Sequence, residues 1–319
     1  MSQFAGLVRA DFDAYAPNKW RSNVFNRERL EVKQHLLALG RELQPLALGA
    51  DGAPLAIEAS VEHPALWNHK QVDAQHVFFS RNEGARKELD AIIDKTRSLA
   101  AQIEDPTPQR THLFLVVTLT HDALELALRL HPEARVDRQN LERKVEEHFE
   151  REKLLARLHA LGDAFRCGIG AQLAPVGEID DARLTALVGE LGKPAPALAL
   201  PGAPARFFVV SSTLPRDEAL AAGPALVDAV RARFGALVPV YQEIAWSRDN
   251  DLLSMRDTLK KEKETRRQRG LAKNDTVRIV RGMFAGKSGT VHEIDARGGL
   301  KVLVGKLAVK VDADDVVKQ

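Results

Sequence analysis

A cluster of polar side chains around a tryptophan is the part of the sequence with the richest chemistry. His63, Trp67, Asn68 and His69 fall within seven residues, and Arg81 follows at the end of an expected strand. Imidazole, amide and guanidinium groups can hold a ligand or move protons, and such groups often gather in loops and at strand ends. The segment is therefore a candidate for a catalytic or ligand-binding pocket. A capped, hydrogen-bonded loop is the alternative interpretation.

Signatures of metal and nucleophile chemistry are missing from the sequence. Ten histidines invite a metal hypothesis, but no His-Glu-x-x-His and no pair of cysteines occurs, so the usual zinc spacings are absent. The sequence also lacks both common glycine-rich phosphate loops and any serine in a nucleophile elbow. We interpret Asp137 and Asn140 as helix-capping residues. We therefore expect no metal site and no cofactor, and the sequence names no catalytic residue.

A second group of candidates lies in a run of cations between Leu252 and Arg269. This segment contains seven basic and three acidic side chains, which is a net charge of +4. A solvated linker helix is one interpretation, and an arm that reaches for phosphate is the other. The candidates for contact with nucleic acid or another partner here are Lys260, Lys263, Arg266, Arg267 and Arg269.

The composition predicts a soluble globular protein. The chain has 319 residues, enough for about two domains, and is 45% hydrophobic and 28% charged. No stretch approaches the roughly 20 apolar residues that a membrane helix needs, and we see no secretory signal. The single cysteine, Cys167, excludes an intramolecular disulfide and fits a reducing compartment. We therefore expect a cytoplasmic protein without a membrane partner, while the net charge of +2 is too small to indicate nucleic acid by itself.

Residues 1–248 must supply the elements that position the pocket candidates, and their sequence mixes helix and strand signals. Hydrophobic alternation predicts strands, and a periodicity of 3.6 residues predicts helices. The strands are expected at 55–61 and 77–80 and in a hairpin of 113–119 with 124–130. Helices are expected at 83–102 and at 138–161. Asp137 should cap the second helix, and Phe149 should lie on its apolar stripe.

The rest of this body contains a proline-rich stretch and a second set of strands. Four prolines make 192–205 a loop or a linker, where the body could be subdivided. A strand at 207–212 should be followed by a helix that begins at Pro224 and ends before Gly235. With a strand at 238–246, this pattern predicts one βαβ unit.

From Leu271 onward, short strands alternate with glycine turns. Val277 and Ile279 share one face of a first strand, and further strands are expected up to 317. The pair at 298–299 is typical of a hairpin turn. Five short strands in about 49 residues favour a small closed barrel, because closure removes the unpaired edges of the sheet.

This segment resembles the KOW motif. The motif occurs in the bacterial elongation factor NusG, in its eukaryotic relatives and in a large-subunit ribosomal protein. The resemblance covers about one-sixth of the chain and implies an SH3-like barrel that binds RNA, ribosomal proteins or transcription and translation factors, without catalysis. The domain that precedes the motif in NusG is not recognisable here. The residues at the spacing of the motif are Asp275, Val277, Gly282, Phe284, Gly286, Gly289, Val291, Ile294 and Asp295.

Four side chains of the expected barrel are candidates for binding. Phe284, between two glycines, could plug one end of the barrel or offer a platform on which a base stacks. Arg278, Arg281 and Lys287 could contact phosphate, although surface solubility explains them as well.

The sequence thus predicts an α+β amino-terminal body, a charged linker helix at 249–270 and a small all-β SH3-like (KOW) barrel at 271–319. We expect a non-catalytic protein that docks on RNA, a ribosome or RNA polymerase as a transcription- or translation-associated factor of bacterial type. Two alternatives stay open. One is a nucleic-acid-processing enzyme with its site in the body, and the other is a protein–protein adaptor. The oligomeric state is not predicted.

Overall fold

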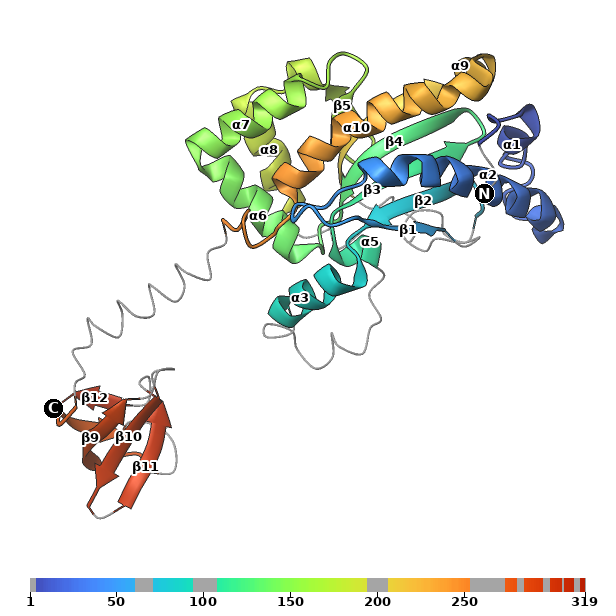
Figure 1. The fold of residues 1–319 in the computed structure, drawn as a ribbon. Coiled ribbons are helices and arrows are strands. Elements are labelled where there is room, and N and C mark those ends of the chain that lie inside the picture. Colours follow the sequence, from blue (N-terminus) through green and yellow to red (C-terminus); the bar gives the residue numbers. More distant parts are fainter. Residues whose placement is uncertain are drawn as a thin grey trace. The chain divides into compact units, whose positions relative to one another are not determined.

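The computed structural model describes residues 4–60, 71–93, 108–193, 206–252, 273–279, 284–294, 299–305, 307–312 and 316–318. The chain divides into residues 1–252, which we call the body, and residues 253–319, which we call the C-terminal unit. The body combines helices with a large antiparallel sheet, and the C-terminal unit contains a separate small antiparallel sheet (Figure 1). The prediction of an α+β body followed by an all-β unit is therefore confirmed.

The sheet of the body has seven strands among the described residues, in the order β1-β2-β3-β4-β7-β5-β6. Each neighbouring pair is antiparallel. The predicted hairpin is confirmed as β3 and β4, which turn at His121 and Asp122. The strands are β1 (Ala56–Ala59), β2 (Ala74–Ser80), β3 (Phe114–Thr120), β4 (Ala123–Leu130), β5 (Arg166–Ile169), β6 (Gln172–Pro175) and β7 (Phe208–Pro215).

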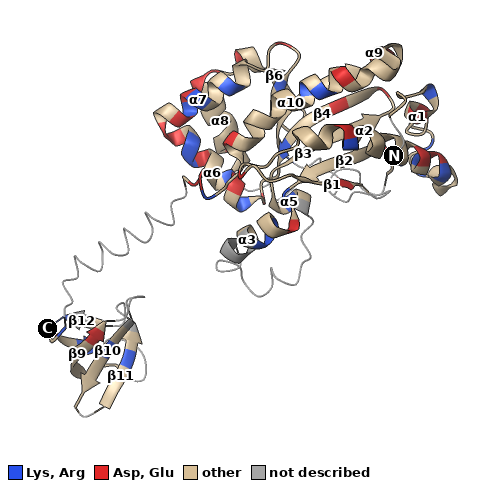
Figure 2. Cartoon of the chain, viewed as in Figure 1, with Lys and Arg blue, Asp and Glu red and all other residues tan. Residues whose placement is uncertain are grey.

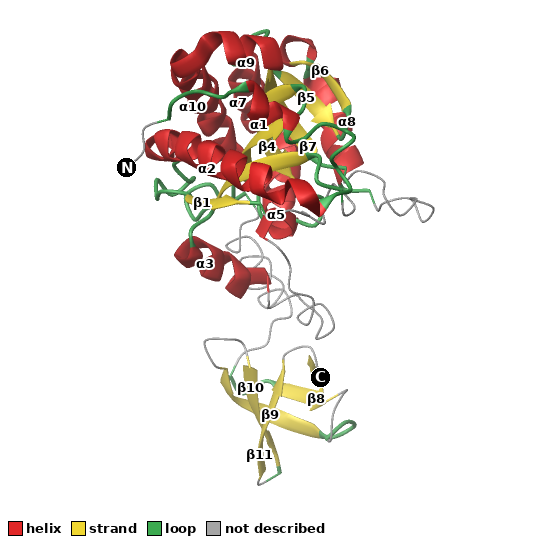
Figure 3. Cartoon of the chain, turned by 90° about the vertical axis from the view of Figure 1, so that its right-hand side faces the viewer, coloured by secondary structure: helices red, strands yellow, loops and turns green. Residues whose placement is uncertain are grey.

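Side chains of the central strands alternate between two apolar layers, because successive residues of a strand point to opposite faces. On β3, Leu115 and Val117 belong to the main core, whereas Phe114 and Val116 belong to a second, smaller cluster. Both faces of this strand are buried, which explains why the run 113–119 is almost entirely apolar. Helices α2 and α10 cover the face that carries the main core (Figure 3).

The helices of the body pack on this sheet or beside its end. The α6, α7 and α8 helices lie together, and α6 and α7 carry interspersed acidic and basic side chains (Figure 2). The described helices are α1 (Arg9–Asp13), α2 (Asn26–Leu43), α3 (Glu83–Ile93), α5 (Pro108–Thr111), α6 (Arg135–Glu146), α7 (His148–His159), α8 (Asp181–Leu191), α9 (Arg216–Ala222) and α10 (Leu226–Ile244). No helix among the described residues is long and apolar enough to cross a membrane.

The predicted βαβ unit is wrong. Residues 226–244 form the single helix α10, which continues through Gly235 and Pro239. Proline lacks a backbone N–H and removes one hydrogen bond from the helix. Side chains of α10 such as Phe234 and Tyr241 are fully buried in the main core, and this packing outweighs the local preference.

The single helix predicted at 138–161 is also wrong. Two helices, α6 and α7, meet at Glu147, whose backbone is extended with φ −84° and ψ 124°. The break changes the helical phase, so Phe149 is 82% exposed instead of lying on an apolar stripe. Asp137 lies inside α6 and does not cap it.

The sheet of the C-terminal unit has five described strands in the order β11-β10-β9-β8-β12. One face carries a core of Val277, Ile279, Val291, Leu300, Val302 and Val316, on which Phe284 also packs. All strand pairs are antiparallel. The strands are β8 (Thr276–Ile279), β9 (Ser288–Ile294), β10 (Gly299–Val304), β11 (Leu307–Asp312) and β12 (Val316–Lys318).

Two glycines of the C-terminal unit have conformations or neighbours that exclude a side chain. Gly286 has a φ of +85°, which L-residues rarely adopt. A Cβ on Gly289 would clash with the backbone carbonyl of Leu303 on the neighbouring strand. These positions explain why glycine recurs in this part of the sequence. The loop at 194–205, the segment 253–270 and residue Arg281 lie outside the described residues.

The only cysteine of the chain is buried in the body. Cys167 lies on β5 and is 1% exposed, within the main core. Burial raises the pKa of its thiol to about 12. The thiol is therefore protonated at neutral pH and packs as a small apolar group.

Candidate functional site

The two predicted RNA-contacting cations of the C-terminal unit that the structure describes are exposed. Arg278 lies on β8 between the buried Val277 and Ile279, so its side chain points away from the core. Lys287 directly precedes β9 and is also exposed. The remaining candidates, namely Arg281 and the linker residues Lys260, Lys263, Arg266, Arg267 and Arg269, lie outside the described residues.

The strand register adds two lysines that the sequence analysis missed. Lys301 on β10 lies opposite Lys310 on β11 on one side and opposite Glu293 on β9 on the other. The Nζ of Lys301 is 3.7 Å from a carboxylate oxygen of Glu293. Like charges that face each other across a strand pair are destabilising, so stability alone does not favour the pairing of Lys301 with Lys310. Lys301 lies between Leu300 and Val302, and Lys310 lies between Val309 and Val311, so this local alternation was the signal that could have placed both lysines outward.

Phe284 occupies a turn before β9 and is half-buried. Its ring packs against the core of the C-terminal unit, and its carbonyl accepts a hydrogen bond from the Lys287 N–H at 3.1 Å. Phe284 therefore contributes to the core of the C-terminal unit, whereas its role as the plug of a barrel stays a prediction. Because the residue is only partly buried, its ring stays a candidate platform on which a base could stack.

Arg81, predicted to line a pocket, is 6% exposed at the end of β2. Its guanidinium donates two hydrogen bonds to the Asp137 carboxylate at 2.6 and 2.7 Å and one to the Trp246 carbonyl at 2.8 Å. Two parallel bonds of this kind fix the geometry of a carboxylate and strengthen the pair. The other predicted pocket residues, His63, Trp67, Asn68 and His69, lie outside the described residues.

Asp137 joins three parts of the body instead of capping a helix. Besides the bonds from Arg81, its carboxylate accepts the backbone N–H groups of Leu113 and Trp246, each at 2.8 Å. Burial alone would raise the pKa of this carboxyl, but the charge of Arg81 and the four hydrogen bonds outweigh burial and keep the pKa below its usual value. The prediction of a capping role for Asp137 is therefore corrected.

Two asparagines fix the segment in which the body ends. Asn140 donates to the Ile244 carbonyl at 3.3 Å and accepts the Leu252 N–H at 3.0 Å. The two N–H protons of the Asn250 amide are shared among three carbonyls near the end of α10, at 2.8 to 3.0 Å. The last carbonyls of a helix have no partner within the helix, so Asn250 satisfies them. Asn140 is thus an anchor and not a capping residue.

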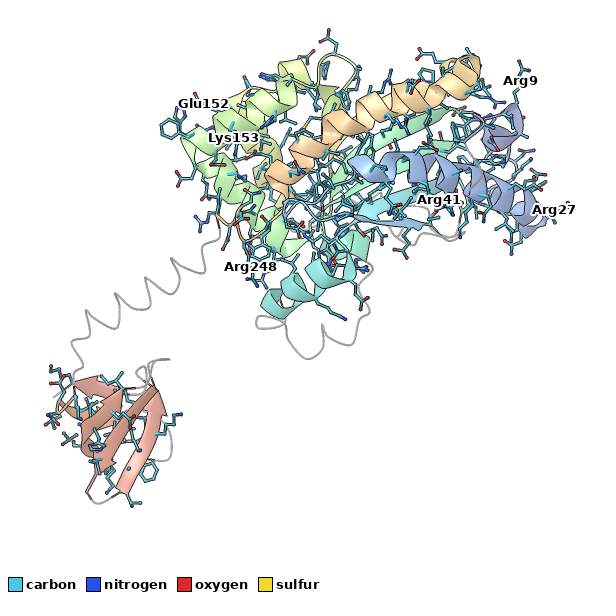
Figure 4. The ribbon with its side chains drawn as sticks, viewed as in Figure 1. Arg9, Arg27, Arg41, Glu152, Lys153 and Arg248 are labelled. Atoms are coloured by element: carbon cyan, nitrogen blue, oxygen red, sulfur yellow. The ribbon has the colours of Figure 1, made fainter. Side chains whose placement is uncertain are left out.

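A buried lysine connects α6, α7 and α10. Lys144 is 1% exposed, and its Nζ lies 2.7 Å from Glu150 and 3.0 Å from Glu243. Lys153, which Figure 4 labels on α7, also has its Nζ 3.0 Å from a carboxylate oxygen of Glu243. The four charges balance, so the lysine is paired in the way that buried charges require. Nothing in the spacing of these residues indicated that they meet.

A cavity of about 200 Å³ lies beside Arg81. Tyr241 lines it and is fully buried, and its hydroxyl has no hydrogen-bond partner among the described residues. Burial raises the pKa of Tyr241 to about 12, so the hydroxyl keeps its proton at neutral pH. The cavity is lined by Gly49, Ala50, Asp51, Ala53, Pro54, Leu55, Arg81, Asn82, Ala85, Tyr241, Trp246, Ser247, Arg248 and Asp249.

Comparison with known proteins identifies no relative. No protein-family model matches the chain, and no curated protein matches it. Within the described ranges, no three His, Cys, Asp or Glu side chains come together in a group that could hold a metal ion. The resemblance of residues 271–319 to the KOW motif therefore depends on the spacing of its own residues.

Proposed function

We propose that this protein is a non-catalytic adaptor that binds RNA through its C-terminal unit and thereby docks on a ribosome or an RNA polymerase. The observation that carries this proposal is the separation of charge along the chain. Residues 252–319 contain 16 of the 46 Lys and Arg residues but only 9 of the 44 Asp and Glu residues. They therefore have a net charge of +7, while the whole chain has +2.

Such a charge distribution favours a phosphate backbone as the partner. Each phosphate that a cation neutralises releases counterions, and this release supplies most of the affinity that does not depend on sequence. Residues 1–251 carry a net charge of −5, so they would repel the same backbone. The positive segment is thus the part of the chain suited to RNA.

The finer fold of the C-terminal unit belongs to the same proposal. An SH3-like barrel of the KOW kind would need the five strands to curl around the apolar cluster that includes Val277 and Val291. Support comes from the antiparallel order β11-β10-β9-β8-β12 and from a core on one face only. Two positions of the motif also have the backbone features that favour glycine, since Gly286 has a positive φ and a Cβ on Gly289 would clash with Leu303.

Single-stranded RNA is the form of RNA that this surface fits. Proteins that bind single strands combine a basic surface, which follows the backbone, with an aromatic ring on which a base stacks. The exposed cations Arg278 and Lys287 would supply phosphate contacts, and the exposed part of Phe284 would supply the stacking surface.

Fluorescence anisotropy with a labelled single-stranded RNA tests the proposal at several salt concentrations. The logarithm of affinity should fall linearly with the logarithm of salt, by about 0.7 per phosphate contact. In the double variant Arg278→Ala with Lys287→Ala, we expect weaker binding and a slope that is smaller by about 1.4.

A matched control removes two exposed arginines from the body. The variant Arg9→Ala with Arg41→Ala changes the net charge by the same amount, and both side chains are exposed on the body (Figure 4). Its affinity for RNA should not fall. No measurable RNA binding by the unaltered protein, or equal losses in both double variants, would contradict the proposal. A partner whose binding barely responds to salt would instead indicate protein–protein docking.

A further inference from the structure

The cavity beside Arg81 lies where three segments distant in sequence meet. The loop at 49–55 forms one wall, the end of β2 and the start of α3 form another, and the residues at and after the end of α10 form the third. The loop is held in place, since Gly49 N–H donates to the Ala53 carbonyl at 2.8 Å and Gln242 donates to the Gly49 carbonyl at 3.2 Å. These bonds tie the loop to its own turn and to α10.

The Tyr241 hydroxyl is the first indication of a ligand. It is fully buried and lacks a hydrogen-bond partner among the described residues, although buried polar groups are nearly always paired. A neighbouring acceptor or donor from a bound molecule would remove this penalty. Asp51 and Arg81 are close enough to the phenol to change its pKa, so polar groups of both kinds surround the same space.

Formal charge decides which class of ligand the cavity can accept. Arg81 is neutralised by its two bonds to Asp137. The other charged residues of the lining are Asp51 and Asp249, against Arg248, so the walls carry no excess of positive charge. Arg248 lies on the body close to α3 (Figure 4). A phosphate or carboxylate would meet a carboxylate of Asp51 or Asp249 without a spare cation, so the lining disfavours an anion.

The uncharged lining is largely apolar, includes an aromatic ring and has Asn82 and Ser247 among its polar side chains. Pro54, Leu55 and Ala85 contribute aliphatic surface, and Trp246 is 9% exposed. Asp51 and Asn82 offer an acceptor and an amide that both donates and accepts. This combination suits an uncharged planar heterocycle that has hydrogen-bonding groups along its edge.

We propose that this cavity binds a nucleobase, either in a free nucleoside or in an unstacked nucleotide of a single strand. The Trp246 ring would contact the face of the base, and Asp51, Asn82 and the Tyr241 hydroxyl would pair with its edge. The site lies in the body and does not depend on RNA binding by the C-terminal unit.

Isothermal titration calorimetry of the 319-residue protein tests the proposal with adenosine, guanosine, cytidine and uridine, each added separately. Inorganic phosphate serves as the anionic comparison. Tyr241→Phe removes the hydroxyl and keeps the ring. The matched control is Tyr15→Phe, since Tyr15 does not line the cavity and its hydroxyl lies 3.3 Å from Gln75.

We expect at least one nucleoside to bind and phosphate not to bind. Tyr241→Phe should lower the affinity for the nucleoside by about two- to tenfold, which corresponds to the loss of one hydrogen bond. Tyr15→Phe should leave this affinity unchanged. A short single-stranded oligonucleotide distinguishes the two sources of the base. The nucleotide form is the ligand if the oligonucleotide binds more tightly than any nucleoside. In that case, Tyr241→Phe should weaken oligonucleotide binding by the same factor in the unaltered protein and in a background that carries Arg278→Ala and Lys287→Ala.

Asp51→Asn gives a second measurement if Tyr241→Phe unfolds the body. Asn can still accept the hydrogen bond that Asp51 accepts from the Ala53 N–H at 3.0 Å, so the loop should keep its shape. The change should shift the preference among the four nucleosides, because an amide replaces a carboxylate at the edge of the base. Absence of binding by any nucleoside or oligonucleotide at millimolar concentration would overturn the proposal. Equal affinities in the unaltered protein and both cavity variants would overturn it too.

Discussion

At the scale of single residues, the stability of the body depends on Asp137. Its carboxylate accepts four hydrogen bonds from the end of β2, the residue before β3 and the residue two positions beyond α10. A buried ion pair need not add stability relative to apolar residues, but removal of one partner leaves the other charge buried without compensation. The carboxylate is thus more important for holding these segments together than its place inside α6 suggests.

The variant Asp137→Asn should lower the free energy of unfolding by about 3–5 kcal/mol, because it leaves the Arg81 guanidinium buried and unpaired. Urea unfolding followed by tryptophan fluorescence measures the change. Glu146→Gln is the matched control, since its pair with Arg143 is about 60% exposed on both sides. Exposed pairs contribute little, so this control should change stability by less than about 1 kcal/mol. Similar losses in both variants would contradict the role given to Asp137.

The lowered pKa of Asp137 also predicts how the difference in unfolding free energy between the unaltered protein and Asp137→Asn depends on pH. The folded state binds a proton at Asp137 less readily than the unfolded state, whose carboxyl has a pKa of about 3.9. The stabilisation is therefore complete above about pH 4 and is lost as the pH falls through the folded-state pKa. We expect the stability difference between the unaltered protein and Asp137→Asn to shrink below pH 4. Burial lowers the pKa of His131 to about 4, and this effect cancels in the comparison.

At the scale of elements, the contact between α2 and the sheet requires a glycine. A Cβ on Gly40 would lie 2.7 Å from the Ile57 Cδ1 and 2.9 Å from the Val77 Cγ1. Helix propensity favours alanine over glycine by about 1 kcal/mol, but overpacking of a dense core costs about 1–3 kcal/mol. The packing cost should exceed the gain in propensity at this position.

Gly40→Ala should therefore lower the free energy of unfolding by about 1 kcal/mol. Gly189→Ala, on the exposed side of α8, provides the comparison because a Cβ there has no neighbour within 4 Å. We expect that change to raise stability by about 0.5–1 kcal/mol. Thermal unfolding of both variants shows whether each change lowers or raises stability. Higher stability in both variants would show that α2 is packed less closely against the sheet than described.

Local sequence signals predicted elements well where periodicity was uniform and failed where packing overrode it. The β3–β4 hairpin was predictable, because apolar residues continue through one strand and alternate in the other. Gly235 suggested the end of a helix, yet α10 passes through it and through Pro239 since its apolar side chains are buried along its length. The α6–α7 break has no proline or glycine at Glu147, so no residue type marked it.

The candidate site was less predictable than the fold for the same reason. Arg81 was identified from its position after a strand, but its partners Asp137 and Trp246 lie 56 and 165 residues away in sequence. Tyr241 was assigned to a strand and could not be placed beside Arg81. Contacts between segments so far apart depend on the tertiary fold, whereas the outward position of Arg278 follows from strand alternation alone.

At the scale of the whole molecule, the body and the C-terminal unit have separate cores. The main core of the body and the cluster that includes Val277 share no residue. All tryptophans and tyrosines of the chain lie in residues 1–252, so intrinsic fluorescence follows the body alone. The two units can therefore be observed separately in the same sample.

Gly289→Ala should disrupt the pairing of β9 with β10, because the new Cβ would clash with the Leu303 carbonyl. Amide signals of the C-terminal unit in NMR spectra should lose dispersion, and RNA binding should fall with them. The fluorescence-detected unfolding of the body should stay unchanged. Gly177→Ala, where a Cβ meets nothing within 4 Å, is the control. A shift of the body's transition in Gly289→Ala would show that the two units unfold together.

The burial of Cys167 has a practical consequence for labelling. Thiol reagents attack the accessible thiolate, and this thiol is both 1% exposed and protonated at neutral pH. A cysteine placed on the surface, for example at Phe149 or Arg27, would react with a maleimide dye or spin label while Cys167 stays unmodified. One cysteine in each unit would then report the distance between them by energy transfer, without first replacing the native residue.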